Sequence, residues 1–196
     1  RDQRKNVYIS PYEHNAVTRT LHHYEEIGKI NIVMLDIDDN FRYDFAKIKK
    51  QFEKNAPFLM VVSHASNVIG LISPVEELCS AAKKFGAITV IDMAQTSGLV
   101  DLNVGLETID FAVFAGHKTI YGPTGIGGFA MKSDFDLNPV LFGGTGFESA
   151  NQDMPSDIPQ RYEMGTLNIV GIAGLYASTG WILDEGMDYL WEHKQK

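Results

Sequence analysis

The stretch ITVIDMAQTSGLVDLNVGLETIDFAVFAGHKTIYGPTGIGGFAM, residues 88–131, decides the fold. It holds two short apolar runs, 88–91 and 111–115, which are rich in β-branched or aromatic residues and too short for buried helices. Each run predicts a parallel strand that is covered on both faces. Asp92 ends the first run and Lys118 closely follows the second. Because the carboxyl ends of the strands form the ligand crevice in open α/β sheets, we expect both side chains at one edge.

The rest of the chain extends this pattern of strands and helices. We expect further strands at 6–10, 32–35 and 58–63, and helices at 16–27, 44–54, 74–85 and 169–185. Ser73, Pro74 and Glu76 predict a capping box at the start of one helix, with Ser73 as the N-cap. The expected fold class is therefore α/β, with a mostly parallel sheet and helices on both faces.

Composition narrows the class of protein. The chain has 196 residues, of which 44% are hydrophobic, enough for one sizeable core. A net charge of −8 gives no reason to expect nucleic acid or an anionic membrane as a partner. No apolar run approaches the roughly 20 residues of a transmembrane helix, and the first residues, RDQRKN, lack an apolar signal core. With one cysteine, Cys79, no internal disulfide forms, so we expect a soluble protein of a reducing cytoplasm.

An acid and an amine at one sheet edge suit pyridoxal phosphate. The lysine amine would form a Schiff base with the aldehyde, and the carboxylate would keep the pyridine nitrogen protonated. Gln95, on the same loop as Asp92, could donate a hydrogen bond to the phenolic oxygen of the ring. The alternative is that Asp92 caps the following turn and Lys118 is a solvated surface lysine. The run GHK directly after a buried strand, followed by GPTGIGG, favours the cofactor site. The acidic turn at 36–40 lacks the pattern of an EF-hand, and we expect no metal site.

Four segments resemble successive signatures of the class V aminotransferases, and most closely those of the cysteine desulfurase and selenocysteine lyase branch. The segments are VSHASNVIG at 62–70, VIDMAQTSG at 90–98, FAGHKTIYGPTGIGG at 114–128 and YEMGTLN at 162–168. They occur in the family's order and span nearly the whole chain, which makes them far more specific than a lone glycine motif.

The resemblance implies a domain plan. Residues 1–186 would form the large pyridoxal-phosphate-binding domain of the aspartate aminotransferase fold (fold type I), incomplete at its N-terminus. Residues 187–196 would begin the linker helix to a small C-terminal domain. A phosphate-binding turn upstream of Arg1, and a nucleophilic cysteine and carboxylate-binding arginines beyond Lys196, would then lie outside the sequence, and we expect this chain alone to be inactive.

The resemblance also implies roles for the site residues. Lys118 would carry the cofactor and shuttle protons, and Asp92 would face the pyridine nitrogen. Gln95 and Asn67 would reach the phenolic oxygen. His14 would stack on the ring, although its position alone favours a polar residue of the first helical turn.

Phosphate binding departs from the family pattern. Ala115 stands where the family commonly has serine or threonine, so a hydroxyl contact is lost. The phosphate would then depend on the backbone, on His117 and on the partner's Thr166, because the loop at 161–168 resembles one that crosses between the subunits of a homodimer. An N-cap for the next helix is the rival explanation for Thr166 or Asn168.

The implied reaction is the removal of sulfur or selenium from L-cysteine or selenocysteine to give alanine, with transfer to a sulfur-acceptor protein. A class V aminotransferase or an epimerase acting on another amino acid is the first alternative, since the same cofactor site serves all of them. A non-catalytic scaffold is the second, and Ala115 is the feature that favours it. Cys79 falls on the apolar stripe of a predicted helix and is expected to be a buried hydrophobe.

Overall fold

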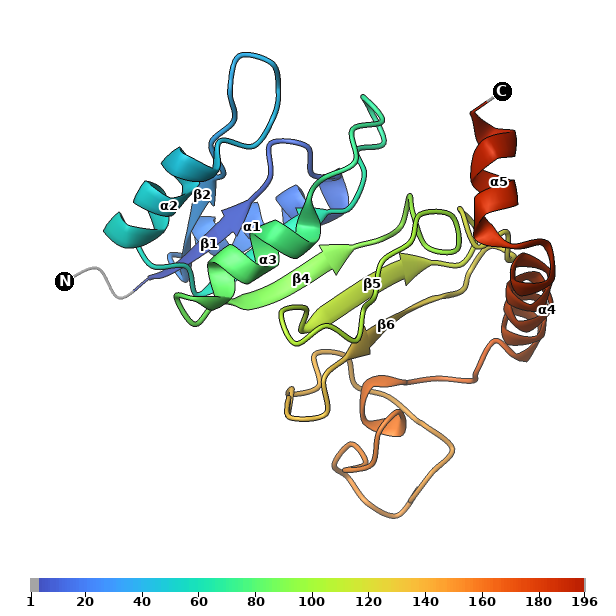
Figure 1. Cartoon of the computed structure of the whole chain (residues 1–196). Coiled ribbons are helices and arrows are strands. Elements are labelled where there is room, and N and C mark those ends of the chain that lie inside the picture. The colour runs from blue at the N-terminus through green and yellow to red at the C-terminus, as the bar shows by residue number, and fades with distance from the viewer. Residues whose placement is uncertain (1–3, 196) are drawn as a thin grey trace.

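A single six-stranded sheet organises the computed structural model, which describes residues 4–195. The strands follow the order β2-β1-β3-β4-β5-β6 (Figure 1). Their bounds are β1 (Lys5–Ile9), β2 (Ile30–Met34), β3 (Leu59–Ser63), β4 (Ile88–Asp92), β5 (Phe111–Ala115) and β6 (Gly127–Met131). Strands β1 to β5 pair in parallel, and β6 pairs antiparallel to β5. The prediction of a mostly parallel α/β sheet is confirmed.

Within residues 4–195, five α-helices accompany the sheet. They are α1 (Asn15–Glu26), α2 (Phe45–Lys54), α3 (Val75–Lys83), α4 (Ile169–Glu185) and α5 (Met187–Lys194), with a 3-10 turn η1 (Gln160–Tyr162). Helices α2 and α3 cover one face, α1 lies on the other, and α4 and α5 stand at the end toward which β4 and β5 point (Figure 1). Among residues 4–195, no helix combines the length and apolarity that crossing a bilayer requires.

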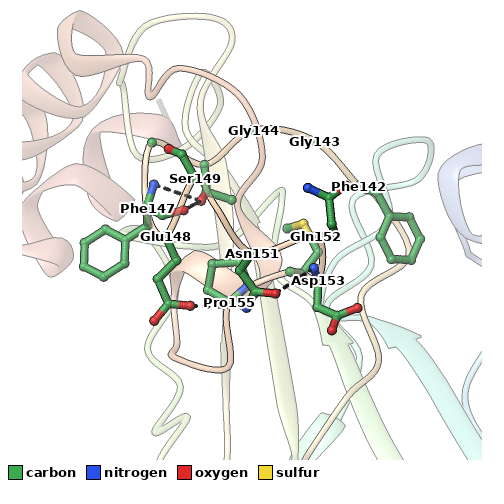
Figure 2. A pocket seen from close by; sticks show the side chains of 13 residues that line it. Phe142, Gly143, Gly144, Phe147, Glu148, Ser149, Asn151, Gln152, Asp153 and Pro155 are labelled. Atoms are coloured by element: carbon green, nitrogen blue, oxygen red, sulfur yellow. Dashed lines mark hydrogen bonds between the residues drawn. The ribbon is translucent and has the colours of Figure 1, made fainter.

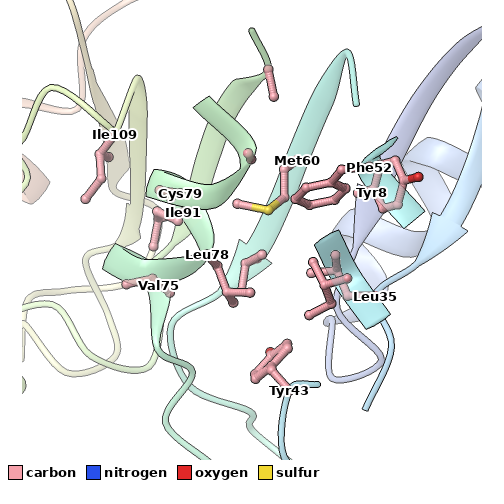
Figure 3. Packing of buried hydrophobic residues seen from close by; sticks show 14 of the residues in the cluster. Tyr8, Leu35, Tyr43, Phe52, Met60, Val75, Leu78, Cys79, Ile91 and Ile109 are labelled. Carbon is pink, nitrogen blue, oxygen red and sulfur yellow. The ribbon is translucent and has the colours of Figure 1, made fainter. Parts of the chain in front are cut away.

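The main core lies between the sheet and the helices α2 and α3 (Figure 3). Tyr8 of β1 is fully buried there, and its ring meets Phe52 of α2 edge to face at 4.8 Å between centroids. The Tyr8 hydroxyl donates to the carbonyl oxygen of Asn55 at 2.8 Å, where α2 ends. The neighbouring strand residues Val7 and Ile9 are buried on the opposite face, against α1. Burial on both faces explains why the strand sequences are continuous apolar runs.

Two local predictions need correction. Ser73 is not the N-cap of α3: Pro74 occupies that position, and no side chain caps the helix. The Ser73 hydroxyl is buried and shares a 2.8 Å hydrogen bond with the hydroxyl of Tyr43. Because Ser73 bonds to this side chain of the core, its hydroxyl does not cap the backbone N–H groups of α3. The antiparallel strand β6 was not predicted as a separate strand, because its sequence GGFAM is glycine-rich and has little intrinsic strand preference.

A buried carboxylate ties the amino end of the sheet together. Asp110, which directly precedes β5, is 3% exposed and accepts a 2.9 Å hydrogen bond from the backbone N–H of Thr89 in β4. It forms ion pairs with Lys83 at the end of α3 and, at 3.6 Å, with Lys132 just after β6. This Asp110 cluster joins one helix and three strands at the edge opposite the carboxyl ends of the parallel strands.

We expect Asp110→Asn to lower the free energy of unfolding by about 2–3 kcal/mol, because it leaves lysine amines without their buried counter-charge. Urea denaturation followed by circular dichroism measures this. The matched control is Glu53→Gln, which breaks an exposed pair with Lys49 (3.7 Å) and should leave the midpoint unchanged. Equal midpoints for the wild type and Asp110→Asn would contradict a stabilising role for the cluster.

Candidate active site

The carboxyl edge of the sheet gathers side chains from four segments of the chain. In the parallel ladder, Ser63 at the end of β3 lies beside Asp92 of β4, and Asp92 lies beside Val113 of β5. One small cavity opens at this edge. The residues that line it are His14, Ser63, Ala65, Asn67, Asp92, Ala94, Gln95 and Lys118. The structure therefore brings together five of the predicted site residues, which are separated by up to about a hundred positions in the sequence.

Asp92 is half-buried and held in place on one side only. Its Oδ1 atom accepts a 2.9 Å hydrogen bond from the backbone N–H of Ala94. This is the turn-capping role that was the alternative to cofactor binding. The Oδ2 atom has no hydrogen-bond partner among the described residues, so one carboxylate oxygen is fixed by the turn and the other is available at the cavity.

A tight loop presents Lys118. The backbone N–H of Gly122 donates to the carbonyl oxygen of Gly116 at 2.7 Å, which closes the loop around the lysine. A side chain at Gly116 would meet Ile126, since a Cβ atom there would lie 2.7 Å from the Cγ2 atom of Ile126. The lysine is half-buried, and within residues 4–195 its amine forms no ion pair. A lysine amine beside a carboxylate in a shared cavity is the arrangement that a carbonyl cofactor requires.

His14 belongs to the start of a helix, as its position in the sequence indicated, and its predicted stacking on a cofactor is a separate question. It is the N-cap of α1, and its Nδ1 atom accepts a 3.1 Å hydrogen bond from the backbone N–H of Ala16. This contact fixes the orientation of the ring while the ring also lines the cavity. Stacking on a cofactor stays a prediction.

Three predicted phosphate contacts lie outside this cavity. His117 and Thr166 are exposed, and Ala115 is half-buried at the end of β5. The helix cap near Thr166 is Asn168, whose Oδ1 atom accepts from the backbone N–H of Gly171 at 2.9 Å. The capping alternative therefore applies to Asn168, and the predicted contact between the partner's Thr166 and phosphate is left untested by a single chain.

Sequence reasoning missed Glu13, which underlies the cavity wall. Its carboxylate accepts hydrogen bonds from the backbone N–H of Ser63 at 2.7 Å, from the Ser63 hydroxyl at 2.8 Å, and from the hydroxyl of Ser10. Burial is the main cause that raises the pKa of Glu13. Because Ser63 is 50 positions away in the sequence, no local pattern predicts this contact.

His64 links two of the strand ends. It is buried at the end of β3, and its Nδ1 atom lies 2.9 Å from the hydroxyl oxygen of Thr96, in the turn that follows Asp92. Burial lowers the pKa of His64 below its ordinary value, so the ring is neutral at physiological pH. The contact braces the turn that carries Asp92 and Gln95.

Cys79 lies away from the site, as the sequence predicted. It is fully buried in α3, and burial raises the pKa of its thiol to about 12. A thiol with so high a pKa is not a nucleophile at neutral pH.

A second hollow lies in the long loop between β6 and η1 (Figure 2). Its lining comes from that loop alone, residues 142–155. Local turns shape it, since the backbone N–H of Asp153 donates to the Asn151 side chain at 3.1 Å and that of Phe147 donates to Thr145 at 3.2 Å. None of the predicted site residues lies there. Within residues 4–195, no three His, Cys, Asp or Glu side chains gather as a metal ion would require.

A family model and several curated proteins match nearly the whole chain. The model of the family described as aminotransferase class-V matches residues 2–196. A probable cysteine desulfurase of Pyrococcus abyssi is 34% identical over 194 residues, which are 97% of this chain and 48% of that protein. A cysteine desulfurase of Haloferax volcanii is 29% identical over 194 residues, which are 97% of this chain and 45% of the relative. The chain thus spans about half the length of the curated relatives it matches.

Solved structures give the same picture. The apo structure of a cysteine desulfurase from Thermococcus onnurineus NA1 superposes with a TM-score of 0.88 at 33% identity, covering 99% of this chain and 50% of the other. A cysteine desulfurase of Escherichia coli superposes with a TM-score of 0.81 over 95% of this chain and 47% of its own. Because the sequence identity is 24%, the similarity to the Escherichia coli structure supports the fold alone.

The buried His64 predicts a pH dependence of stability. Below its ordinary pKa of 6.5 the unfolded chain takes up a proton that the folded protein refuses, so stability is lost as the pH falls through the lowered folded pKa. We expect His64→Gln to flatten this dependence between pH 7 and pH 5, measured by urea midpoints. The control His22→Gln, at an exposed position of α1, should keep the wild-type slope. An unchanged slope in His64→Gln would assign the effect to other groups.

Proposed function

Since the chain belongs to the class V aminotransferase family, we propose that it forms the pyridoxal 5′-phosphate site of an enzyme that removes sulfur or selenium from L-cysteine or selenocysteine to give alanine. The observation that carries the proposal is the shared cavity of Asp92 and Lys118 at the ends of β4 and β5. Relatives described as cysteine desulfurases, at up to 34% identity, support this choice of substrate.

The residues present fit the cofactor. Asp92 has a carboxylate oxygen that no described residue uses, which suits a protonated ring nitrogen. Within residues 4–195 the Lys118 amine forms no ion pair, which suits a reaction with a carbonyl carbon. Gln95 and Asn67 supply amides for the phenolic oxygen, and His14 supplies a flat ring at the same cavity. When bound, pyridoxal phosphate supplies an electron sink for the α-carbon of the substrate.

Each residue then has a defined task. The carboxylate of Asp92 would hold a proton on the ring nitrogen, and the turn that fixes its other oxygen orients the side chain. The Lys118 amine would hold the cofactor and would move the proton at the substrate α-carbon. The loop closed between Gly116 and Gly122 keeps that amine within reach.

Phosphate binding is proposed to involve two copies of the chain. Ala115 offers no hydroxyl, and a charge-assisted hydrogen bond contributes about 1.5–3 kcal/mol, so its loss would weaken cofactor binding about tenfold or more. His117 and the partner's Thr166 would supply contacts in a homodimer. The exposure of both side chains in one chain supports this arrangement.

The domain plan is also a proposal. Residues up to 186 form the large cofactor domain, of which 1–3 lie outside the described residues, and α5 begins the linker. Gly186, at φ 86°, separates α4 from α5 and supports a boundary there. The sulfur acceptor would be a thiol other than Cys79, on this protein or on an acceptor protein, since the Cys79 thiol has a pKa of about 12.

Borohydride reduction tests the cofactor site. We expect the natural protein that carries this chain, treated with pyridoxal phosphate and borohydride, to show a phosphopyridoxyl group on Lys118 by peptide mass mapping. Lys118→Ala should abolish the adduct, because the amine is lost. The control Lys84→Ala, at an exposed lysine beyond α3, should retain it. An adduct elsewhere, or none, would overturn the proposal.

Product analysis tests the reaction. With L-cysteine and a reducing thiol, we expect alanine and sulfide in equal amounts. A keto acid in place of alanine would instead assign transamination, and D-cysteine would assign epimerisation. If Lys118→Ala were to keep the biological function of the protein, the scaffold alternative would stand.

A further inference from the structure

Glu13 is a half-buried carboxylate to which the proposed function gives no task. It lies in the loop between β1 and α1 and receives three hydrogen bonds, two from Ser63 and one from Ser10. Ser10 and Ser63 are themselves 1% and 4% exposed. These hydrogen bonds lower the pKa of Glu13 and so favour its ionised form, whereas burial, the largest effect, raises the pKa.

The position of Glu13 connects two parts of the cavity wall. Ser63, its main partner, ends β3 in register with Asp92. His14, the next residue in the chain, caps α1 and lines the cavity. Glu13 therefore ties the loop that carries His14 to the strand end beside Asp92.

The charge of Glu13 has no cation to balance it. Among residues 4–195 no lysine or arginine pairs with it. The titratable groups that influence it are Asp92 on β4 and the phenol of Tyr43 before α2, and neither is cationic. The cavity lining thus holds one carboxylate, Asp92, and one lysine, Lys118, while Glu13 lies outside the lining and is hydrogen-bonded to the lining residue Ser63. A cation that enters the cavity would be stabilised by both carboxylates when they are ionised.

We propose that Glu13 is a positioning residue of the cofactor site, which anchors the His14 loop to β3 and adds a second negative charge behind Asp92 that favours a cationic ring nitrogen. This inference rests on the proposed function. A neutral glutamine could make most of the same hydrogen bonds at a lower desolvation cost, so anchoring alone does not require an acid at this position.

Two variants separate the two effects. Glu13→Gln removes the charge and keeps groups that can bond to Ser63 and Ser10, whereas Glu13→Ala removes both. Glu53→Gln, at the exposed pair with Lys49, is the matched control for loss of a carboxylate.

Hydrogen–deuterium exchange on the cofactor-free protein measures the anchor. We expect Glu13→Ala to speed exchange in peptides covering 10–16 and 60–64, with no change around the distant Asp110 cluster. Glu13→Gln and the control should resemble the wild type. Unchanged exchange in Glu13→Ala would overturn the anchoring role.

The ratio of dissociation constants for pyridoxal phosphate and its 1-deaza analogue, in which CH replaces the ring nitrogen, measures the charge effect. We expect the preference of the wild type for pyridoxal phosphate to fall about fivefold in both Glu13 variants, because a neighbouring anion stabilises only the protonated nitrogen. A ratio unchanged from the wild type in Glu13→Gln would overturn the electrostatic role. A purely structural residue would change both affinities together.

The experiments distinguish an error in the role of Glu13 from an error in the proposed cofactor site. If the wild type forms no adduct on Lys118 under borohydride, the cofactor proposal fails, while the exchange experiment still reports on the anchor. If the adduct forms and the ratio does not respond to Glu13, only the charge inference fails.

Discussion

The parallel pairing of β3, β4 and β5 is the constraint on which the site depends. Hydrogen bonding sets Ser63, Asp92 and Val113 in adjacent register, so the polar residues that follow each strand emerge at one edge. A shift of one residue in either ladder would turn Asp92 to the opposite face of the sheet and away from the loop of Lys118. The apolar faces of the strands, packed against α2 and α3 on one side and α1 on the other, specify that register.

The sequence predicted what local pattern can encode. Buried parallel strands are continuous apolar runs, and the acid and amine that follow two of them have a recognisable chemistry, so Asp92 and Lys118 could be placed without coordinates. Ser73 was assigned to a helix end because its buried partner, Tyr43, is distant in sequence. Glu13 was missed for the same reason. Contacts between residues 30 to 50 positions apart depend on the packing of the whole domain. They produce no periodic pattern in the sequence from which they could be predicted.

Two carboxylates, one buried and one half-buried, are compensated in different ways at the two ends of the sheet. At the amino end, Asp110 is neutralised by Lys83 and Lys132, as expected of a charge that serves stability. At the carboxyl end, Glu13 is satisfied by hydroxyl and amide donors that carry no net charge. Hydrogen bonds solvate the second carboxylate without cancelling its charge, so its ionised form would add a negative potential beside the cavity.

The N-cap of α4 has a consequence for conformational entropy. Besides capping the helix, the Asn168 side chain donates a 3.1 Å hydrogen bond to the carbonyl oxygen of Gly125, in the glycine-rich loop that follows Lys118. Farther along α4, Gly174 packs so closely on Pro123 that an added Cβ atom would lie 2.9 Å from its ring. A loop rich in glycine would otherwise sample many backbone conformations. Clamped by α4 at two points, it has little freedom left to lose when a ligand binds, and the binding energy is correspondingly less diminished.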